Sequence, residues 1–345
     1  MLQIYSDTKI YVHAPAGVTT GGVELLHQLV DFLRRNGKIA YVVYYGIGEH
    51  VIPDEYAEYN IEVVEEELVE NSSHHVEIYT ETMPGLLLKN TKCTQKFLWW
   101  LSVDNYYCNY DELCLRDIFA WNREAGKRFM IYRLRRFLHG YNDFRGKISL
   151  SKLLEKSTCC GYQSEYIKRF LLKNGFKKIV PLFDYINTDY TSNISLADKE
   201  DIVLYNPSKG YEFTKQLIAL APDIQWLALK GYTRKQLVDL LKKAKVYIDF
   251  GNHPGKDRLP RECAMNGCCI ITGKRGSAAY YEDVSIPDIY KFDERIVRKE
   301  DVIKKIRWIF DNYSQAIDDL SSYRNKIAGE KEEFERQIKE IFIGK

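Results

Sequence analysis

A loop rich in cations, glycine and proline offers the densest cluster of side chains that could bind an anion. Residues 253–260 read His-Pro-Gly-Lys-Asp-Arg-Leu-Pro, and a second glycine-flanked turn follows at 273–277. Guanidinium and ammonium groups pair with phosphate oxygens, and helix amino termini add free N–H donors. The cations Lys256, Arg258 and Arg275 therefore predict a diphosphate site. For each cation taken singly, a solvated surface charge is the alternative.

Two further turns combine glycine with the start of a predicted helix. Gly21 and Gly22 open one such helix, and Lys209 and Gly210 precede another. Glycine lets a phosphate or a sugar come close to the backbone at a helix amino terminus. The first turn has neither the G-x-G-x-x-G pattern of a nicotinamide site nor the G-K-[ST] of an ATP-type loop. A plain turn is the alternative reading of both segments.

Alternating strands and helices are predicted to hold these turns. The apolar runs 39–45, 76–80 and 97–101 read as buried strands. Between residues 26 and 33, four apolar side chains recur at the spacing of one helix face. Parallel buried strands joined by helices indicate an α/β fold with a doubly wound sheet.

The same alternation restarts near residue 201 and predicts a second Rossmann-like unit. A polar, turn-rich stretch before it is the expected hinge. The expected strands are 201–205, 224–229, 246–250 and 268–272, and the expected helices are 212–220, 233–243 and 261–266. The expected domains are 1–185 and 201–328, with a linker at 186–200 and a C-terminal helix at 329–345 that returns to the first domain.

Composition excludes several classes of protein. The net charge of +2 comes from 50 basic and 48 acidic residues, whereas domains that coat nucleic acid are usually far more basic. No apolar run approaches the roughly 18 residues that a bilayer span needs, and residues 1–7 do not resemble a signal peptide. We therefore expect a cytoplasmic protein without a nucleic-acid partner.

The eight cysteines include two vicinal pairs, Cys159–Cys160 and Cys268–Cys269, and no C-x-x-C spacing. Adjacent strand residues point to opposite faces, so the pairs are poor disulfide candidates. We expect all of the cysteines to be reduced and buried, and we expect no metal site.

The order of these motifs resembles that of GT-B glycosyltransferases, especially glycosyltransferase family 4 (group 1) and its relatives. Residues 21–24, Gly-Gly-Val-Glu, are similar to the Gly-Gly-x-Glu turn of that family's first domain. Lys209-Gly210 is similar to the Lys-Gly at the first helix of its second domain. Residues 259–267 resemble its Leu-Pro-x-x-Glu-Ala-Met-x-x-Gly stretch, with one residue fewer between Pro and Glu.

The resemblance implies two Rossmann-like domains facing a donor cleft. It also implies transfer of a sugar from a nucleotide-diphosphate sugar to a saccharide or lipid-linked acceptor, in the synthesis of cell-surface polysaccharide or glycolipid. The transfer is expected to retain the anomeric configuration and to need no metal and no cofactor. The implied donor-binding residues are Lys209, Gly210, Arg258, Glu262, Gly276, Ser277, Gly21 and Gly22.

One departure concerns the donor sugar. The family usually has an earlier glutamate near that sugar, and this chain has Pro254 there. His253 or Asp257 is expected to contact the sugar instead, with Asn252 as a third candidate. On the acceptor side the catalytic candidate is Asp104, where family relatives carry polar cleft residues; a helix cap or turn aspartate is the alternative.

A concentrated basic stretch at 122–139 interleaves six cations with aromatic and aliphatic residues. Such a helix can lie on an anionic membrane, which would place the protein at the inner face of the cell membrane. An ordinary amphipathic helix is the alternative. Two further functions stay open: another GT-B enzyme, such as a phosphorylase or an epimerase, and a non-catalytic module that binds a glycan or a protein partner.

Overall fold

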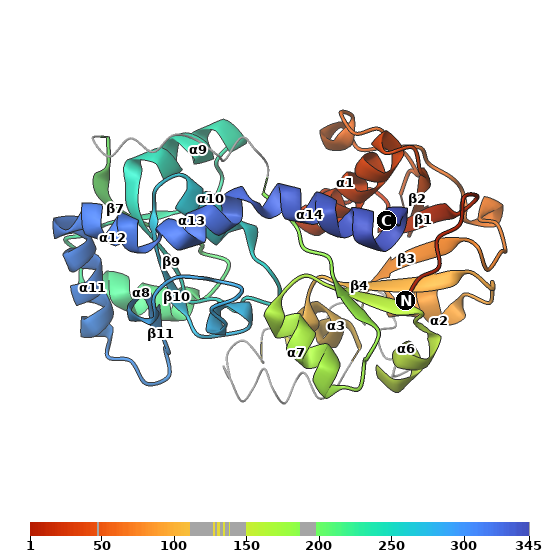
Figure 1. Cartoon of the computed structure of the whole chain (residues 1–345). Helices are drawn as coiled ribbons and strands as arrows, with labels where there is room; N and C mark the ends of the chain where they lie inside the picture. Colours follow the sequence, from red (N-terminus) through yellow and green to blue (C-terminus); the bar gives the residue numbers. More distant parts are fainter. Residues whose placement is uncertain are drawn as a thin grey trace. The chain divides into compact units, whose positions relative to one another are not determined.

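The computed structural model describes residues 1–46, 48–110, 150–186 and 198–344, together with the helical residues 127, 130, 131, 134 and 138. The chain divides into two compact units (Figure 1). Most of the predicted hinge, 186–200, lies outside the described residues. Unit 1 comprises Met1–Gln163, Ile167–Phe183 and Glu335–Lys345, and unit 2 comprises Ser164–Tyr166 and Asp184–Phe334.

Unit 1 is built on a six-stranded parallel sheet, sheet A, in the order β2-β1-β3-β4-β5-β6. The predicted strands 39–45 and 76–80 are confirmed to the residue, and the predicted strand 97–101 begins two residues earlier. The strands are β1 Lys9–Pro15, β2 Ile39–Tyr45, β3 Val76–Thr80, β4 Gln95–Trp100, β5 Cys159–Tyr162 and β6 Ile179–Pro181. The helices are α1 Gly21–Arg35, α2 Pro84–Lys89, α3 Val103–Tyr110, α6 Leu150–Lys156 and α7 Glu165–Lys173, with short turns η1 Asp54–Tyr56 and η2 Glu66–Leu68.

The core of unit 1 follows from the sequence pattern. Leu26, Leu29, Val30 and Leu33 of α1 are buried, which confirms the predicted face, and α1 contacts β1 and β2. The indole N–H of Trp99 donates to the carbonyl of Leu182 over 2.9 Å, so even this buried polar group is paired. All residues of β3, and all but the first of β4, are buried, so both faces of sheet A are covered at these strands, as is typical of a parallel sheet.

Unit 2 is built on a five-stranded parallel sheet, sheet B, in the order β11-β10-β9-β7-β8. Its strands are β7 Glu200–Tyr205, β8 Gln225–Ala228, β9 Ala244–Asp249, β10 Cys269–Gly273 and β11 Lys291–Phe292. Its helices are α8 Tyr211–Leu220, α9 Arg234–Lys243, α10 Arg258–Met265, α11 Lys299–Asp311, α12 Tyr313–Asp319 and α13 Ser321–Ala328, with turns η4 Ser277–Ala279 and η5 Asp288–Tyr290. Helix α14 Glu330–Ile338 begins in unit 2, and its last residues and the π-helical turn η6 Lys339–Ile343 belong to unit 1.

Local signals explain most of the element ends in unit 2. Thr233 and Gln236 form a capping box that starts α9, at the expected start of the helix 233–243. The predicted helix 261–266 was wrong at its start, because α10 already begins at Arg258. Pro260 lies inside the first turn of α10, where the missing N–H has no intrahelical partner to lose.

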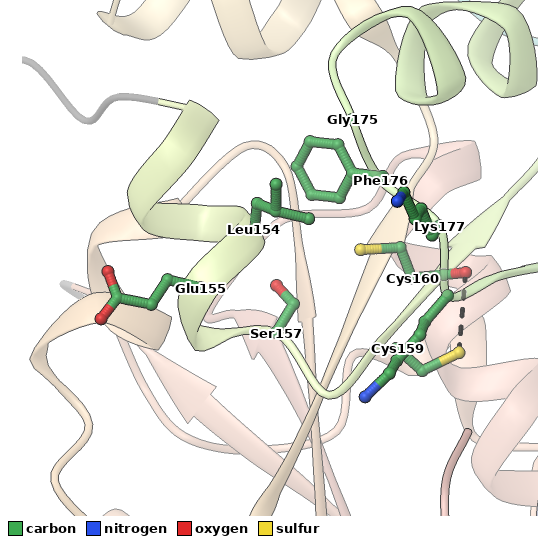
Figure 2. A pocket seen from close by; sticks show the side chains of 9 residues that line it. Leu154, Glu155, Ser157, Cys159, Cys160, Gly175, Phe176 and Lys177 are labelled. Atoms are coloured by element: carbon green, nitrogen blue, oxygen red, sulfur yellow. Dashed lines mark hydrogen bonds between the residues drawn. The ribbon is translucent and has the colours of Figure 1, made fainter.

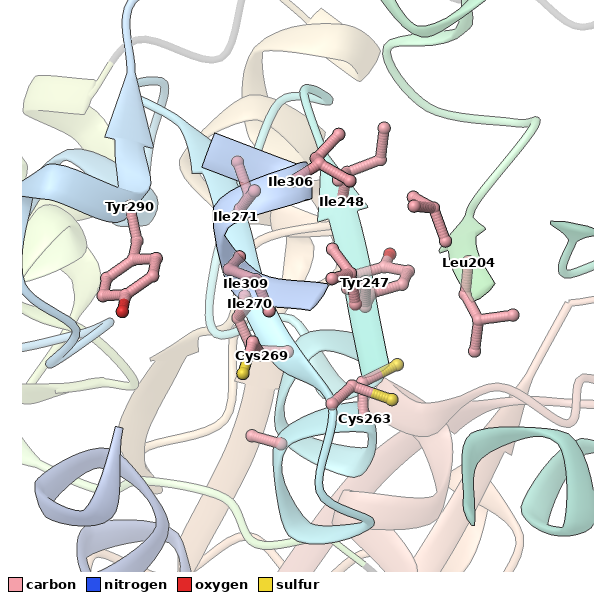
Figure 3. Packing of buried hydrophobic residues seen from close by; sticks show 14 of the residues in the cluster. Leu204, Tyr247, Ile248, Cys263, Cys269, Ile270, Ile271, Tyr290, Ile306 and Ile309 are labelled. Carbon is pink, nitrogen blue, oxygen red and sulfur yellow. The ribbon is translucent and has the colours of Figure 1, made fainter. Parts of the chain in front are cut away.

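The hydrophobic core of unit 2 lies between sheet B and its helices. Figure 3 shows Ile248 of β9 with Ile270 and Ile271 of β10, beside Ile306 and Ile309 of α11. All five side chains are at most 1% exposed. These β-branched residues fit a sheet covered on both faces, so the sequence reads as near-continuous apolar runs.

The cysteines of the described residues are free thiols. The pairs Cys159–Cys160 and Cys268–Cys269 are buried, as predicted. The expectation that every cysteine is buried was wrong for Cys93, which is exposed in the loop before β4. Cys108 and Cys114 lie outside the residues whose side chains are described.

Both sheets reverse their strand order at one place. In sheet A the chain passes from β1 to β2 on one side and later to β3 on the other, so the reversal lies between β1 and β3. In sheet B the same reversal lies between β7 and β9. Open α/β sheets bind ligands beyond the carboxyl ends of the strands at such a switch point. The topology thus marks one candidate edge in each unit.

Candidate functional site

The loops after β7 and β9 meet at the switch point of sheet B. Lys209 and Gly210 lie between β7 and α8, and the loop 250–257 joins β9 to α10. Gly210 has φ of +62°, and a Cβ added there would clash with the carbonyl carbon of Phe250. Only glycine combines this backbone conformation with so close an approach of two backbones. The predicted Lys-Gly turn thus packs directly against the loop after β9.

Two carboxylates lie at this edge, Asp257 in the second loop and Asp249 at the end of β9. The Lys209 ammonium donates to Oδ2 of Asp257 over 2.7 Å. Asp249, the last residue of β9, is 3% exposed. Its Oδ2 accepts from the Tyr247 hydroxyl over 2.9 Å, and its Oδ1 accepts from the Gly251 N–H over 2.8 Å. Asp257 therefore holds the ammonium of Lys209 beside the amino terminus of α8.

His253 lies between the two carboxylates. Its Nε2 is 3.6 Å from Oδ1 of Asp249, and its Nδ1 is 3.5 Å from Oδ2 of Asp257. Burial disfavours the charged imidazole, but the two carboxylates outweigh it and raise the pKa of His253 above its usual value. Burial likewise opposes ionisation of Asp249, yet the fields of His253 and Lys209 lower its pKa to about 2.

The turn at 276–277 holds the loop of His253 from the other side. The Ser277 N–H donates to the His253 carbonyl over 2.9 Å, and the Ser277 hydroxyl donates to the Gly255 carbonyl over 2.6 Å. Gly276 has φ of +59°, and an added Cβ would overlap the His253 carbonyl. The predicted residues Gly276 and Ser277 therefore lie against the predicted loop, and the Ser277 side chain fastens that loop.

Arg261 anchors the same loop from within α10 and is 1% exposed. Its guanidinium pairs with Asp184 over 2.6 Å and with Glu330 over 2.5 Å. It also donates to the carbonyls of Lys256 and Asp257, over 3.0 and 3.1 Å. Burial opposes the charge, but the two carboxylates raise the pKa of Arg261 further. A buried guanidinium with this many partners fixes the backbone that carries Asp257.

The cations predicted to hold a diphosphate, Lys256, Arg258 and Arg275, all have a carboxylate partner in the folded chain. Lys256 pairs with Glu330 over 2.7 Å, and Arg275 pairs with Glu294. Arg275 also donates to the Phe250 carbonyl over 2.8 Å. Lys256 and Arg275 are thus engaged in ion pairs within the folded chain, and their contact with a diphosphate stays a prediction. No spacing in the sequence links them to these distant carboxylates.

The remaining predicted residues of unit 2 lie on α10. Arg258 opens the helix, and its Nε is 3.7 Å from Oδ2 of Asp184. Glu262 is half-buried one turn further on. The side chain of Arg258 is 19% exposed.

In unit 1 the predicted residues lie beyond the carboxyl ends of two strands, β1 and β4. Gly21 and Gly22 form the first turn of α1, and Asp104 lies in the first turn of α3.

Glu81, directly after β3, was not predicted. Its side chain is fully buried, and its Oε2 accepts from the Leu101 N–H over 2.8 Å. Its Oε1 has no hydrogen-bond partner among the described residues. Burial raises the pKa of Glu81 to about 8.

A cavity of about 250 Å³ lies elsewhere in unit 1. Figure 2 shows Cys159 and Cys160 of β5 on one side and Leu154 and Glu155 of α6 on the other. These residues stand at the amino end of β5, whereas parallel sheets bind ligands at the carboxyl ends of their strands. The cavity is therefore separate from the candidate edge of sheet A.

The set most suited to a metal among the described residues is Asp249, His253 and Asp257, whose ligand atoms lie within 4.8 Å of one another. The two carboxylates face different nitrogens of one imidazole, however, and a single ion can bind only one of those nitrogens. The Lys209 ammonium already supplies a positive charge to Asp257. The arrangement fits an ion-pair chain better than a metal site.

Comparison with solved structures decides the fold. No protein-family model matches the sequence, and no curated protein matches it. HepE from Anabaena, solved with UDP, superposes with a TM-score of 0.62 at 10% identity, over 96% of this chain and 98% of HepE. The chain has the GT-B fold of glycosyltransferases.

Two further structures agree with this assignment. Sucrose-phosphate synthase from Thermosynechococcus elongatus aligns with a TM-score of 0.61 at 11% identity, over 97% of this chain and 98% of the synthase. A glycosyltransferase from Rickettsia africae aligns with a TM-score of 0.56 at 13% identity, over 97% and 99% of the two chains. The predicted GT-B class, with two parallel Rossmann-like sheets, is thus confirmed.

Within this GT-B fold, the sequence interpretation missed Asp249, Arg261 and Glu81. Asp249 had a usable signal, since it ends an apolar strand just before the cation-rich loop. Arg261 lies inside the motif at 259–267, but its role depends on Asp184 and Glu330, which are far away in the sequence. Glu81 follows a predicted strand directly, and nothing near it in the sequence indicates burial.

Proposed function

We propose that the chain is a glycosyltransferase that moves a sugar from a nucleotide-diphosphate sugar to a saccharide or lipid-linked acceptor. The observation that carries the proposal is the placement of Lys209 beside the amino terminus of α8 at the switch point of sheet B. An ammonium and a helix amino terminus together attract a diphosphate. HepE, which shares the fold, was solved with UDP and with UDP-glucose.

Each donor-side residue receives a role in this proposal. Lys209 and the N–H groups beyond Gly210 contact the diphosphate, and Arg258 adds a second cation at the amino terminus of α10. Glu262 accepts hydrogen bonds from the ribose. The turn at Gly276 and Ser277 contacts the phosphates through its backbone. In unit 1, Gly21 and Gly22 stay predicted donor-binding residues.

The charge that develops on the leaving diphosphate is balanced by Lys209, Arg258 and the start of α8. Fixed cations and dipoles of this kind stabilise a transition state without reorganisation. We therefore propose a transfer that needs no metal ion. A retaining transfer has no obligate protein base, and we assign Asp104 of unit 1 to the acceptor hydroxyl. The products would enter cell-surface polysaccharide or glycolipid.

Release of nucleoside diphosphate from a panel of nucleotide sugars tests the activity directly. Purified protein is incubated with each donor and with oligosaccharide or lipid-linked acceptors, in the presence of EDTA. We expect acceptor-dependent release from one donor class, and its loss in Lys209→Met. Binding of a nucleotide sugar without any release would instead support the non-catalytic binding module.

Described residues of the basic stretch 122–139 support a peripheral membrane contact. Met130, Ile131, Leu134 and Leu138 are helical and between 49% and 72% exposed. Their spacing places them along one face of a helix, and Lys127 is exposed at the same spacing. An apolar stripe flanked by cations fits the interface of an anionic membrane. Among the described residues, no helix is both long enough and apolar enough to cross a bilayer.

Vesicle sedimentation tests this contact, which would place the enzyme at the cytoplasmic face of the membrane. The protein should sediment with vesicles that contain anionic lipid and much less with neutral vesicles. The double variant Leu134→Glu, Leu138→Glu should abolish sedimentation. Leu172→Glu, an equally exposed leucine on α7, is the matched control and should leave it unchanged. Equal loss in both variants would contradict the assignment.

A further inference from the structure

The imidazole of His253 occupies an enclosed position between two acids. The side chain is 1% exposed, and neither ring nitrogen has a partner at hydrogen-bond distance among the described residues. Nε2 faces Oδ1 of Asp249 at 3.6 Å, and Nδ1 faces Oδ2 of Asp257 at 3.5 Å. Each nitrogen is thus directed at a different carboxylate.

A neutral imidazole does not suit these two neighbours. It carries one N–H, so its second nitrogen would turn a lone pair toward a carboxylate oxygen. In a buried site such a contact is repulsive and no water relieves it. An imidazolium presents an N–H to both carboxylates. The raised pKa of His253 agrees with this reading.

The charges that face His253 come from three segments of unit 2. Asp249 lies on β9, Asp257 lies at the start of α10, and Lys209 approaches from the loop after β7. The Tyr247 hydroxyl, another titratable group, donates to Oδ2 of Asp249, whereas Oδ1 of Asp249 faces His253. With His253 protonated, two carboxylates, one ammonium and one imidazolium sum to zero, the neutral balance that a buried site favours.

We propose that His253 is a positioning residue, which as an imidazolium holds Asp257 so that Asp257 in turn fixes the ammonium of Lys209. The chain Asp249–His253–Asp257–Lys209 then links the end of β9 to the amino terminus of α8. Its last step, contact between Lys209 and a nucleoside diphosphate, rests on the proposed function. His253 therefore acts on the donor through Asp257 and Lys209 and does not itself contact the sugar.

Nuclear magnetic resonance of protein labelled with ¹⁵N in its seven histidines tests the protonation state without any ligand. The signals of His253 are assigned as those missing from His253→Gln. Both of its ring nitrogens should carry protons at neutral pH, and Asp257→Asn should lower its pKa. A single N–H at neutral pH would overturn the proposal, and so would displacement of the ring protons by added Zn²⁺ or Mn²⁺.

The pH profile of UDP affinity tests the positioning step by calorimetry on the full chain. Wild-type affinity should fall as the pH rises through the pKa of His253, because the proton that holds Asp257 is lost. His253→Gln should bind about tenfold more weakly, the effect of one charge-assisted hydrogen bond, and its profile should be flat over that range. His50→Gln, at a partly exposed histidine in unit 1, should keep the wild-type profile.

A second variant, Asp257→Asn, tests the positioning role independently in case His253→Gln does not fold. Asp257→Asn keeps the size of the side chain and should flatten the profile in the same way. A wild-type profile in Asp257→Asn would overturn the positioning role. Absence of binding by any nucleoside diphosphate would refute the proposed function, while the resonance experiment would still decide the state of His253.

Discussion

The Nζ atom of Lys209 lies 2.7 Å from Oδ2 of Asp257, and this hydrogen bond ties the loop after β7 to the loop after β9. The two loops flank the place where sheet B reverses its strand order. The pair thus sets one ammonium beside the amino terminus of α8. The predictions below follow from this edge and from the buried charges that support it.

Lys209→Met should weaken binding of a nucleoside diphosphate about 10- to 100-fold, the effect of losing one or two charge-assisted hydrogen bonds. Lys215→Met is the matched control, because Lys215 is an exposed lysine on α8, the helix that follows Lys209. Calorimetric titration measures both variants. Equal affinities of the two variants would contradict the assignment of Lys209.

Gly210→Ala should destabilise the protein by more than Gly231→Ala. Both glycines have positive φ, +62° and +82°, so both substitutions introduce a strain of about 1–2 kcal/mol. At Gly231 an added Cβ meets nothing within 4 Å, whereas at Gly210 it clashes with Phe250. Urea denaturation of the two variants therefore isolates the cost of the clash. Similar losses of unfolding free energy at both positions would show that the two loops do not pack directly against each other.

Arg261→Met should lower the free energy of unfolding by about 3–5 kcal/mol, because it removes the buried guanidinium that pairs with both Asp184 and Glu330. Arg307→Met breaks an exposed ion pair with Asp223, whose side chains are 48% and 61% exposed, and should cost about 1 kcal/mol or less. Chemical denaturation at neutral pH compares the two. A small loss at Arg261 would contradict its anchoring role.

The cost of Arg261→Met should also depend on pH. Burial raises the pKa of Asp184, but Arg261, Lys256 and Arg258 outweigh burial and lower it. A carboxylate whose pKa is lowered in the folded state stabilises that state above its unfolded pKa and loses this contribution as the pH falls. The difference between wild type and Arg261→Met should therefore narrow on acidification. A constant difference from pH 7 to pH 3 would count against the ion pair.

Glu81→Gln should make the protein more stable at alkaline pH. The pKa of Glu81 is about 8 in the folded state against an ordinary value of 4.5. The folded state therefore keeps a proton that the unfolded state has lost, so wild-type stability falls as the pH rises between these two values. The penalty approaches roughly 4–5 kcal/mol at and above pH 8.

The gain from Glu81→Gln should accordingly grow between pH 4.5 and pH 8 and then level off. Glu55→Gln, at an exposed glutamate of η1, is the control and should show no such trend. Thermal denaturation across this pH range measures both variants. A gain that is independent of pH would mean that Glu81 is ionised in the folded protein.

The fold was largely predictable because buried parallel strands leave a strong local signal. The runs that became β2 and β3 were predicted to the residue, since both are rich in β-branched and aromatic residues. The start of α10 was missed because the proline inside its first turn suggested a later boundary. Local pattern identifies the strands well, and it marks helix starts less reliably.

The candidate site was predictable only in part. Lys209 and Gly210 were found because the strand–turn–helix order is visible in the sequence. The partners of Lys256 and Arg275 were not, because Glu330 and Glu294 reach them only through folding of the C-terminal part of unit 2. Burial of His253 between two acids depends on three separate segments, and no spacing in one segment reveals it.

Thermal stability of the purified full chain against a panel of nucleoside diphosphates and nucleotide sugars, in EDTA, tests the central claim most directly. Ligand binding to the native state raises the midpoint by mass action. We predict a selective rise with one nucleotide class that persists in EDTA, disappears in Lys209→Met and remains in Lys215→Met. No rise with any nucleotide, in a well-folded sample, would contradict the assignment of this edge of sheet B as a sugar-nucleotide site.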